Sequence, residues 1–191
     1  MTAPVPWIEA FARERGLRYE PDADERWFRA WEPFATLRVA LRYEHALSAT
    51  GGASSVSVAR IVVERAPSSE VGSWIAIVQD ERLSAKAATT NDFTGVFGEP
   101  LDLVAPARRP TKDAVFDHVF ASFSDTPEAL EEALTPSLRR LLFSWRTPVH
   151  AEIRPGGFVV APVTLSADDV GLRWLFSALP IFREKATKQG Q

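Results

Sequence analysis

Three side chains in one short stretch could do chemistry together: His150, Glu152 and Arg154. They alternate with apolar residues, so on a β-strand all three project from one face. An imidazole beside a carboxylate and a guanidinium could transfer a proton or bind an anion. The simpler interpretation is a solvated sheet face with alternating charges, which contributes little energy. This face is our candidate for an enzyme or small-ligand-binding site.

The other histidines and the absence of cysteine give no further template for catalysis. His45 shares the parity of the apolar residues of a predicted strand, which places it at the end of a buried face. His118 follows Asp117, and neighbours on a strand point to opposite faces, so they cannot form a dyad directly. Without cysteine, thiolate nucleophiles, disulfides and the common structural zinc sites are excluded. We predict no metal and no cofactor.

Two arginine pairs raise the question of phosphate binding. Arg108 and Arg109 form one pair, and Arg139 and Arg140 form the other. No nucleic-acid-binding motif surrounds them, and the net charge of -3 provides no overall basic field. Solvated faces explain both pairs, so we predict no nucleic-acid partner.

Predicted strands position the candidate residues. The 149–164 stretch has an alternating arm, a Pro-Gly-Gly turn and an apolar arm, which predicts a hairpin. Upstream, strands at 36–47, 56–65 and 74–83 are separated by Gly/Ser-rich loops and predict an antiparallel meander. In the first of these, apolar residues alternate with mostly polar ones up to Tyr43, which predicts one buried and one wet face.

Proline and its preceding residues mark the predicted helices. Residues 6–16 form a short amphipathic pattern ending at a glycine. Thr126 and Thr135 each precede a proline, so each predicts a helix start with threonine as N-cap, and the chain should bend near Thr135. A last helix should begin at Ser166 as N-cap and meet Pro180 near its end.

These patterns predict an α+β fold, with a largely antiparallel sheet covered on one side by C-terminal helices. The 191 residues show no repeat and no linker, so we predict a single domain over 1–191. The segment 84–111 is poorly patterned, with one possible strand near 101–104. It is long enough to form a flap over a binding surface, although an irregular connection is the simpler interpretation.

The sequence also contains more large apolar side chains than one sheet can cover. In the last helix they spread widely around the cylinder, and residues 25–34 have a similar composition. Either a second layer of the same chain buries them or a partner does. The leading hypothesis is a noncatalytic binding or assembly module that contacts a protein partner or a second copy through Trp27, Trp31, Leu172, Trp174 and Phe176.

No stretch approaches the roughly 18 apolar residues of a membrane span, and the first 16 residues lack a secretory pattern. We therefore expect a cytoplasmic protein without a membrane span, and leave peripheral membrane contact open.

Residues 116–163 carry a further indication. They read FDHVFASFSDTPEALEEALTPSLRRLLFSWRTPVHAEIRPGGFVVAPV and include a Leu-Thr-Pro-Ser motif at 134–137 that opens a helix. In these features the C-terminal half resembles a bacterial family of unknown function. Many members of that family look membrane-anchored through N-terminal spans, which we do not find here. The resemblance implies architecture and supplies no catalytic residues.

Overall fold

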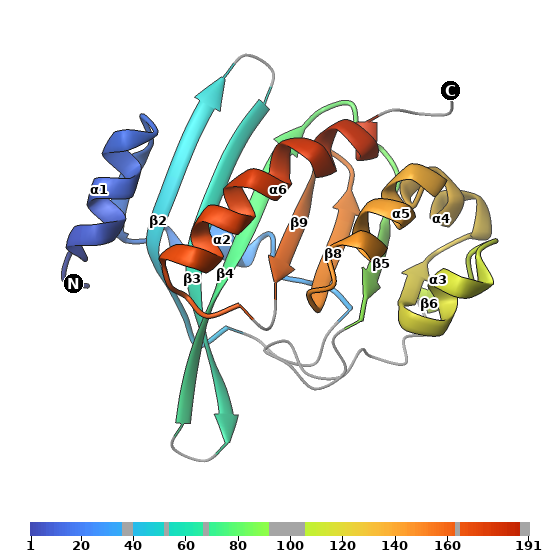
Figure 1. Ribbon diagram of the computed structural model, residues 1–191, viewed down its shortest axis with the longest axis horizontal. Coiled ribbons are helices and arrows are strands. Elements are labelled where there is room, and N and C mark those ends of the chain that lie inside the picture. Colours follow the sequence, from blue (N-terminus) through green and yellow to red (C-terminus); the bar gives the residue numbers. More distant parts are fainter. Residues whose placement is uncertain (36–39, 52–53, 67–68, 92–105, 163–164, 188–191) are drawn as a thin grey trace.

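The fold is built around one large antiparallel sheet (Figure 1). It is known from a computed structural model that describes residues 1–35, 40–51, 54–66, 69–91, 106–162 and 165–187. Within these ranges nine strands are ordered β1-β2-β3-β4-β9-β8-β5-β7-β6, and every pair is antiparallel. Their bounds are β1 Arg18–Asp22, β2 Arg42–Gly51, β3 Ser54–Ala66, β4 Ser69–Asp80, β5 Ala87–Thr90, β6 Ala107–Arg108, β7 Ala121–Ser124, β8 Val149–Arg154 and β9 Gly157–Pro162.

Helices cover both faces of this sheet. The front face in Figure 1 carries α1, α6, α5 and α4, α3 lies beside β6 and β7, and α2 lies behind. Their bounds are α1 Pro6–Glu14, α2 Glu25–Arg29, α3 Ala114–Val119, α4 Pro127–Ala133, α5 Pro136–Ser144 and α6 Asp169–Thr187. The predicted α+β fold and the C-terminal helices on one face are confirmed.

Two apolar clusters show that the sheet is buried on both faces, whereas one wet face was predicted for the strand at 36–47. On β4, Trp74 and Val78 point into the front cluster with the helices α1, α4, α5 and α6. Ile75 and Ile77 point the other way, into a second cluster that contains Phe28 of α2. Because α2 and the residues after it cover the back face, the central strands are apolar on both sides.

The helix pair follows the predicted capping chemistry. The Thr126 hydroxyl accepts a hydrogen bond from the Ala129 backbone N–H at 3.1 Å, and the Thr135 hydroxyl accepts one from Leu138 N–H at 3.3 Å. Both threonines are N-caps with proline at the first helical position. The predicted bend at Thr135 therefore separates α4 from α5.

The start and end of the last helix differ from the prediction. The Asp168 carboxylate accepts from Gly171 N–H at 2.9 Å, whereas Ser166 lies outside the helix. Asp168 thus accepts a hydrogen bond from a backbone N–H of the first turn, the N-cap role that was predicted for Ser166. Pro180 lies inside α6, which continues to Thr187, so this helix tolerates the loss of one backbone hydrogen bond.

The first strand of the meander also differs from the predicted alternation. Leu41 is exposed although Tyr43 is buried, and the predicted residues 36–39 lie outside the described part of the chain. The register shifts between Glu44 and Leu47, and His45 has a positive φ of 54°. This bulge buries consecutive residues on both faces, so a period of two fails here.

The poorly patterned segment contributes two strands to the sheet, β5 and β6. Its β5 lies between β8 and β7, and β6 forms the edge beyond β7. The predicted strand near 101–104 and much of the predicted flap fall outside the described residues. His118 lies on α3, so placing it on a strand was wrong.

Candidate functional site

The predicted polar triad lies on the back face of β8, and it is not solvated. His150 is 1% exposed and Glu152 0%, while the Arg154 side chain is 16% exposed. The solvated-face interpretation is therefore wrong. The three side chains do share one face, as the alternation predicted, because the intervening apolar residues point into the front cluster.

Glu152 is the centre of this cluster. Its Oε1 accepts from the backbone N–H groups of Phe34 at 2.8 Å and Ala35 at 3.2 Å, and lies 2.8 Å from His150 Nε2. Its Oε2 pairs with Arg154 Nη2 at 2.5 Å. One carboxylate thus ties β8 to the chain segment that follows α2. We call Glu152, His150, Arg154 and the two backbone N–H groups the back-face clamp.

Arg154 extends the clamp over the same segment. Its guanidinium donates to the carbonyl oxygens of Ala30, at 3.5 Å, and Glu32. It also lies 5.8 Å from the ring centroid of Trp31 and 5.3 Å from that of Phe34. These contacts hold residues 30–35 against the sheet.

The electrostatics of Glu152 favour its ionised form. Burial raises the pKa of its carboxyl group, but the hydrogen bond from His150 and the charges of His150 and Arg154 lower it more. The pKa of Glu152 therefore lies below its ordinary value. A carboxylate with a lowered pKa and four donors is a weak proton acceptor at neutral pH. Its arrangement suits a structural role.

The predicted interface on the last helix is largely covered by the chain itself. Leu172 is 0% exposed, so its assignment to an exposed interface was wrong. Trp174 and Phe176 are half-buried: Trp174 contacts Trp145, the residue that follows α5, at 5.1 Å between centroids, and Phe176 contacts Phe11 of α1 at 5.3 Å. The flanking elements therefore cover part of Trp174 and Phe176, whereas Val170 and Ile181 of α6 stay exposed.

Trp27 and Trp31 also have partners within the chain. Trp27 packs edge-on against Phe28 at 4.9 Å between centroids, and lies 6.3 Å from Trp31. A Cβ added to Gly157 of β9 would lie 2.8 Å from Trp31. Both indoles are half-buried against the second cluster, so they help α2 to cover the back face.

Sequence reasoning missed an apolar surface formed by α3 and α5. Val115 on α3 is 67% exposed and Phe143 on α5 is 47% exposed, and Val119 is also exposed. A hollow of about 220 Å³ lies between these helices. We call it the α3–α5 groove; its lining comprises Asp113, Val115, Phe116, Arg139, Arg140, Phe143 and Ser144. The signal in the sequence was Asp113 as an N-cap, which marks 114–119 as a helix.

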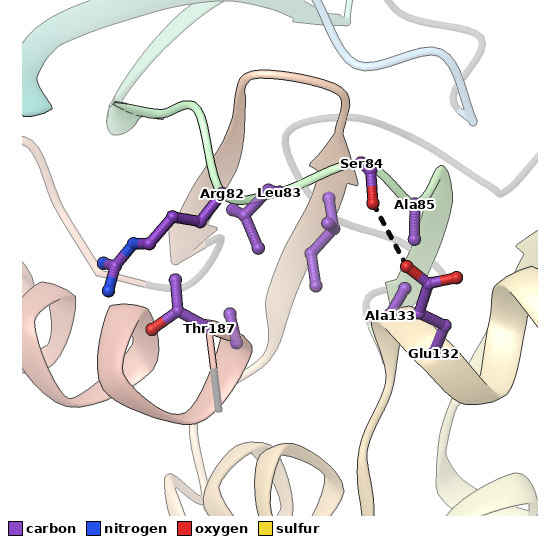
Figure 2. A pocket seen from close by; sticks show the side chains of 9 residues that line it. Arg82, Leu83, Ser84, Ala85, Glu132, Ala133 and Thr187 are labelled. Atoms are coloured by element: carbon purple, nitrogen blue, oxygen red, sulfur yellow. Dashed lines mark hydrogen bonds between the residues drawn. The ribbon is translucent and has the colours of Figure 1, made fainter. Parts of the chain in front are cut away.

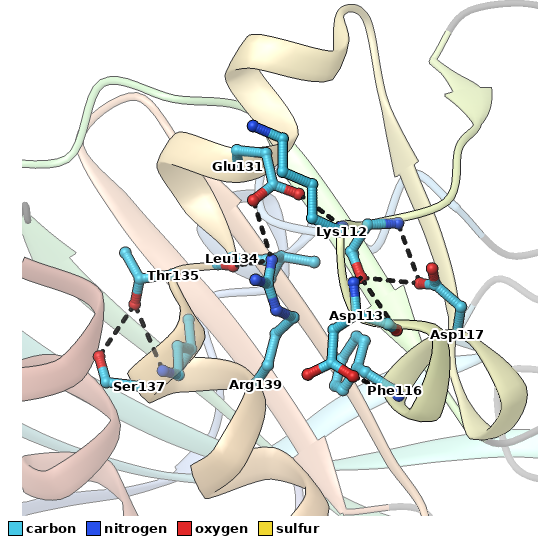
Figure 3. Close-up of polar contacts among 11 residues, drawn as sticks. Lys112, Asp113, Phe116, Asp117, Glu131, Leu134, Thr135, Ser137 and Arg139 are labelled. Carbon is cyan, nitrogen blue, oxygen red and sulfur yellow. Dashed lines mark hydrogen bonds and ion pairs between the residues drawn. The ribbon is translucent and has the colours of Figure 1, made fainter.

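Arg139 lies beside this groove and corrects a second prediction. It is only 4% exposed, although we predicted a solvated arginine pair. Its Nη1 donates to the Leu134 carbonyl at 2.8 Å and pairs with Glu131 at 3.3 Å (Figure 3). Arg139 thus caps the C-terminal end of α4. Its buried Nε has no hydrogen-bond acceptor in the described part of the chain. Arg140 is exposed.

A network of short contacts fixes the other wall of the groove (Figure 3). The Asp113 carboxylate accepts from Phe116 N–H at 3.1 Å and so caps α3. Asp117 accepts from both the backbone N–H, at 3.0 Å, and the hydroxyl, at 2.9 Å, of Thr111. Glu131 accepts from the Lys112 backbone N–H at 2.9 Å. These bonds join α3 to α4 and keep the groove in one shape.

Two other hollows suit a ligand less well. One lies between the turn after β4, α4 and the end of α6, where Ser84 donates to Glu132 at 3.2 Å (Figure 2). Its volume of about 10 Å³ holds about one water molecule. The other is more open, but its two arginines, Arg82 and Arg183, both pair with buried Asp80, at 2.6 Å and 2.7 Å. Both guanidinium groups are thus already engaged by the Asp80 carboxylate, and Glu184 adds a second acidic side chain to the lining.

Within the described residues no group of three or more His, Asp or Glu side chains is arranged to hold a metal ion. Among the helices described, none combines the length and hydropathy that crossing a membrane requires.

Comparison with known proteins finds a similar fold in a solved structure. No protein-family model and no curated protein matches the sequence. The chain is similar in structure to the crystal structure of the mycobacterial trehalose monomycolate transport factor A, TtfA, with a TM-score of 0.56 and 11% sequence identity over 94% of this chain and 90% of that one. At this identity the likeness concerns the fold alone. It extends over almost the whole chain, beyond the C-terminal half that resembles a bacterial family of unknown function.

Proposed function

We propose that this protein is a noncatalytic binding module that acts through protein–protein contacts at the α3–α5 groove. The observation that carries the proposal is the exposure of Val115 and Phe143 beside a hollow, on helices fixed by caps and ion pairs. Large apolar side chains around a preformed hollow are typical of protein interfaces.

The size of the groove favours a protein partner over a small ligand. Pockets that enclose small molecules have volumes of roughly 300–1,000 Å³ and bury most of the ligand. The groove has about 220 Å³ and is open to solvent at Val115 and Phe143. A hollow of this size suits one or two side chains inserted from a partner surface.

The chemistry at the back-face clamp supports the noncatalytic part of the proposal. Glu152 already accepts from His150, Arg154 and two backbone N–H groups, and both Glu152 and His150 are buried. A general base needs reach to a substrate proton, which such burial prevents. The enzyme or ligand-binding alternative at this hairpin therefore gains no support from the geometry.

The similar solved structure agrees with this proposal at the level of fold. That protein is described as a transport factor for trehalose monomycolate. A sheet-and-helix arrangement like this one is thus found in a transport factor, and a role without catalysis is compatible with it.

A photocrosslinking experiment in the organism that encodes the protein tests the proposal. A photoreactive amino acid replaces Val115 in the full chain, and the matched control replaces Ser177, which is exposed on α6. We expect discrete protein adducts at position 115 that disappear with Phe143→Asp and are absent at position 177. An adduct of twice 21.1 kDa would identify a second copy as the partner.

The absence of any protein adduct at position 115, or identical adducts at both positions, would contradict the proposed function. Equal urea midpoints for the wild type and Phe143→Asp would establish that the variant folds.

A further inference from the structure

We infer that the α3–α5 groove receives a segment of a partner protein that combines one large apolar side chain with a neighbouring carboxylate. This inference rests on the proposed function, and adds the chemistry by which the partner is recognised.

The apolar requirement comes from the lining of the groove. Phe116 is buried at its base, and Val115 and Phe143 stand exposed at its rim. A partner side chain placed there would remove apolar surface of both proteins from water. Side chains inserted in this way form the energetic centre of most protein interfaces.

The carboxylate requirement comes from hydrogen-bond donors that lack acceptors. Arg140 lines the groove and is exposed, and no acceptor for it lies within the described ranges. Arg139 is nine-tenths buried beside it, and its Nε, which has no acceptor among the same residues, is itself covered by the chain. The guanidinium of Arg140 is therefore the donor that a partner carboxylate can reach, and the buried charge of Arg139 adds to the positive potential there.

The acidic groups near the groove are already engaged. Asp113 caps α3 through Phe116 N–H, and Glu131 accepts from Lys112 N–H and pairs with Arg139. The excess of donors over free acceptors therefore complements a carboxylate. Arginine binds carboxylates with parallel hydrogen bonds, which gives geometric selection as well as attraction.

The test uses two dipeptides that differ only in charge. The full chain, labelled with ¹⁵N, is titrated with acetyl-Asp-Phe-amide and separately with acetyl-Asn-Phe-amide at millimolar concentrations. We expect amide shifts confined to α3, α5 and their caps, and binding of the Asn peptide weaker by about three- to ten-fold.

Variants then separate the two requirements. Arg140→Glu should reverse the preference, so that acetyl-Lys-Phe-amide binds better than the Asp peptide. Arg13→Glu makes the same charge change at an exposed site on α1 and should leave the preference unchanged. Phe143→Ser should weaken the binding of all three peptides.

The outcomes distinguish this inference from the proposed function. Equal binding of the three peptides, or shifts outside α3 and α5, would overturn the inference. If position 115 forms specific adducts in cells, that result would leave the proposed function standing. Peptide binding with charge selection, but no adduct at position 115, would support the groove chemistry and contradict a protein partner in the cell.

Discussion

Glu152 and Arg139 are both charged side chains buried inside the protein, and their surroundings differ in one respect. Glu152 receives donors on both oxygens, from His150, Arg154 and two backbone N–H groups. Arg139 finds acceptors for Nη1 in Glu131 and Leu134, but none for Nε in the described part of the chain.

This difference separates a structural cluster from a candidate recognition surface. Where the chain supplies every partner, the charge joins two segments and has nothing left for a ligand. Where a buried arginine lies beside the exposed guanidinium of Arg140 and an exposed apolar surface, a partner can supply an acceptor to Arg140. The residues that look most reactive in the sequence are therefore the ones already used by the fold.

The largest expected effect follows from removing the centre of the back-face clamp. Glu152→Ala should lower the free energy of unfolding by about 3–5 kcal/mol, because it removes the charge partner of Arg154 and the acceptor of two backbone N–H groups. Urea unfolding followed by circular dichroism measures this loss.

Ala151→Gly on the same strand serves as a matched control, because it removes a small side chain and leaves the clamp intact. A loss for Glu152→Ala no greater than that of the control would show that the clamp does not hold residues 30–35.

A smaller loss is expected at Arg139. Arg139→Met should cost about 1–3 kcal/mol of unfolding free energy, because the Leu134 carbonyl loses its donor while Glu131, being partly exposed, can be hydrated. The same urea experiment measures it, and Arg140→Met at an exposed neighbour is the control. A cost equal to that of Glu152→Ala would remove the distinction between the two buried charges.

A still smaller loss of unfolding free energy is expected at the N-caps of α4 and α5. Thr135→Ala should lower the free energy of unfolding by about 1 kcal/mol, because it removes the cap of the helix that carries Arg139 and Phe143. Thr126 caps the exposed start of α4, so Thr126→Ala should lower the free energy of unfolding by no more than Thr135→Ala does. Thermal unfolding of both variants measures the order, and a larger loss for Thr126→Ala would contradict it.

Local chemistry in the sequence was enough to predict much of the fold. The Thr-Pro steps, the Pro-Gly-Gly turn and the Gly/Ser loops act over a few residues, so the helix pair, the hairpin and the meander were predicted. Positions decided by tertiary packing were not. The bulge at His45 and the cover of α2 over the back face depend on residues far apart in the chain.

The candidate site was harder to predict for the same reason. Alternation placed His150, Glu152 and Arg154 on one face, but only the return of residues 34 and 35 to that face buries them. The exposed surface on α3 was missed because the pattern around His118 predicts a strand, which hides the N-cap role of Asp113. The spacing of four residues between Val115 and Val119 is typical of one face of a helix and would have indicated α3.

The smallest expected effect concerns a third buried polar group, His45, whose Nδ1 lies 2.9 Å from the Tyr19 hydroxyl. That hydroxyl accepts from Val5 N–H at 3.0 Å, so its own proton can be donated to an unprotonated Nδ1. Burial lowers the pKa of His45 below 6.5, with the charge of Arg60 acting in the same direction and that of Glu44 opposing it.

Because the unfolded chain binds the proton more readily, the contribution of His45 is present above pH 6.5 and is lost as the pH falls below it. We expect the free energy of unfolding, measured in urea at pH 7 and pH 5.5, to fall more in the wild type than in His45→Asn. Asparagine tolerates the positive φ at this position, so the variant removes the titration and keeps the bulge. An equal fall in both proteins would contradict a contribution of neutral His45 to stability.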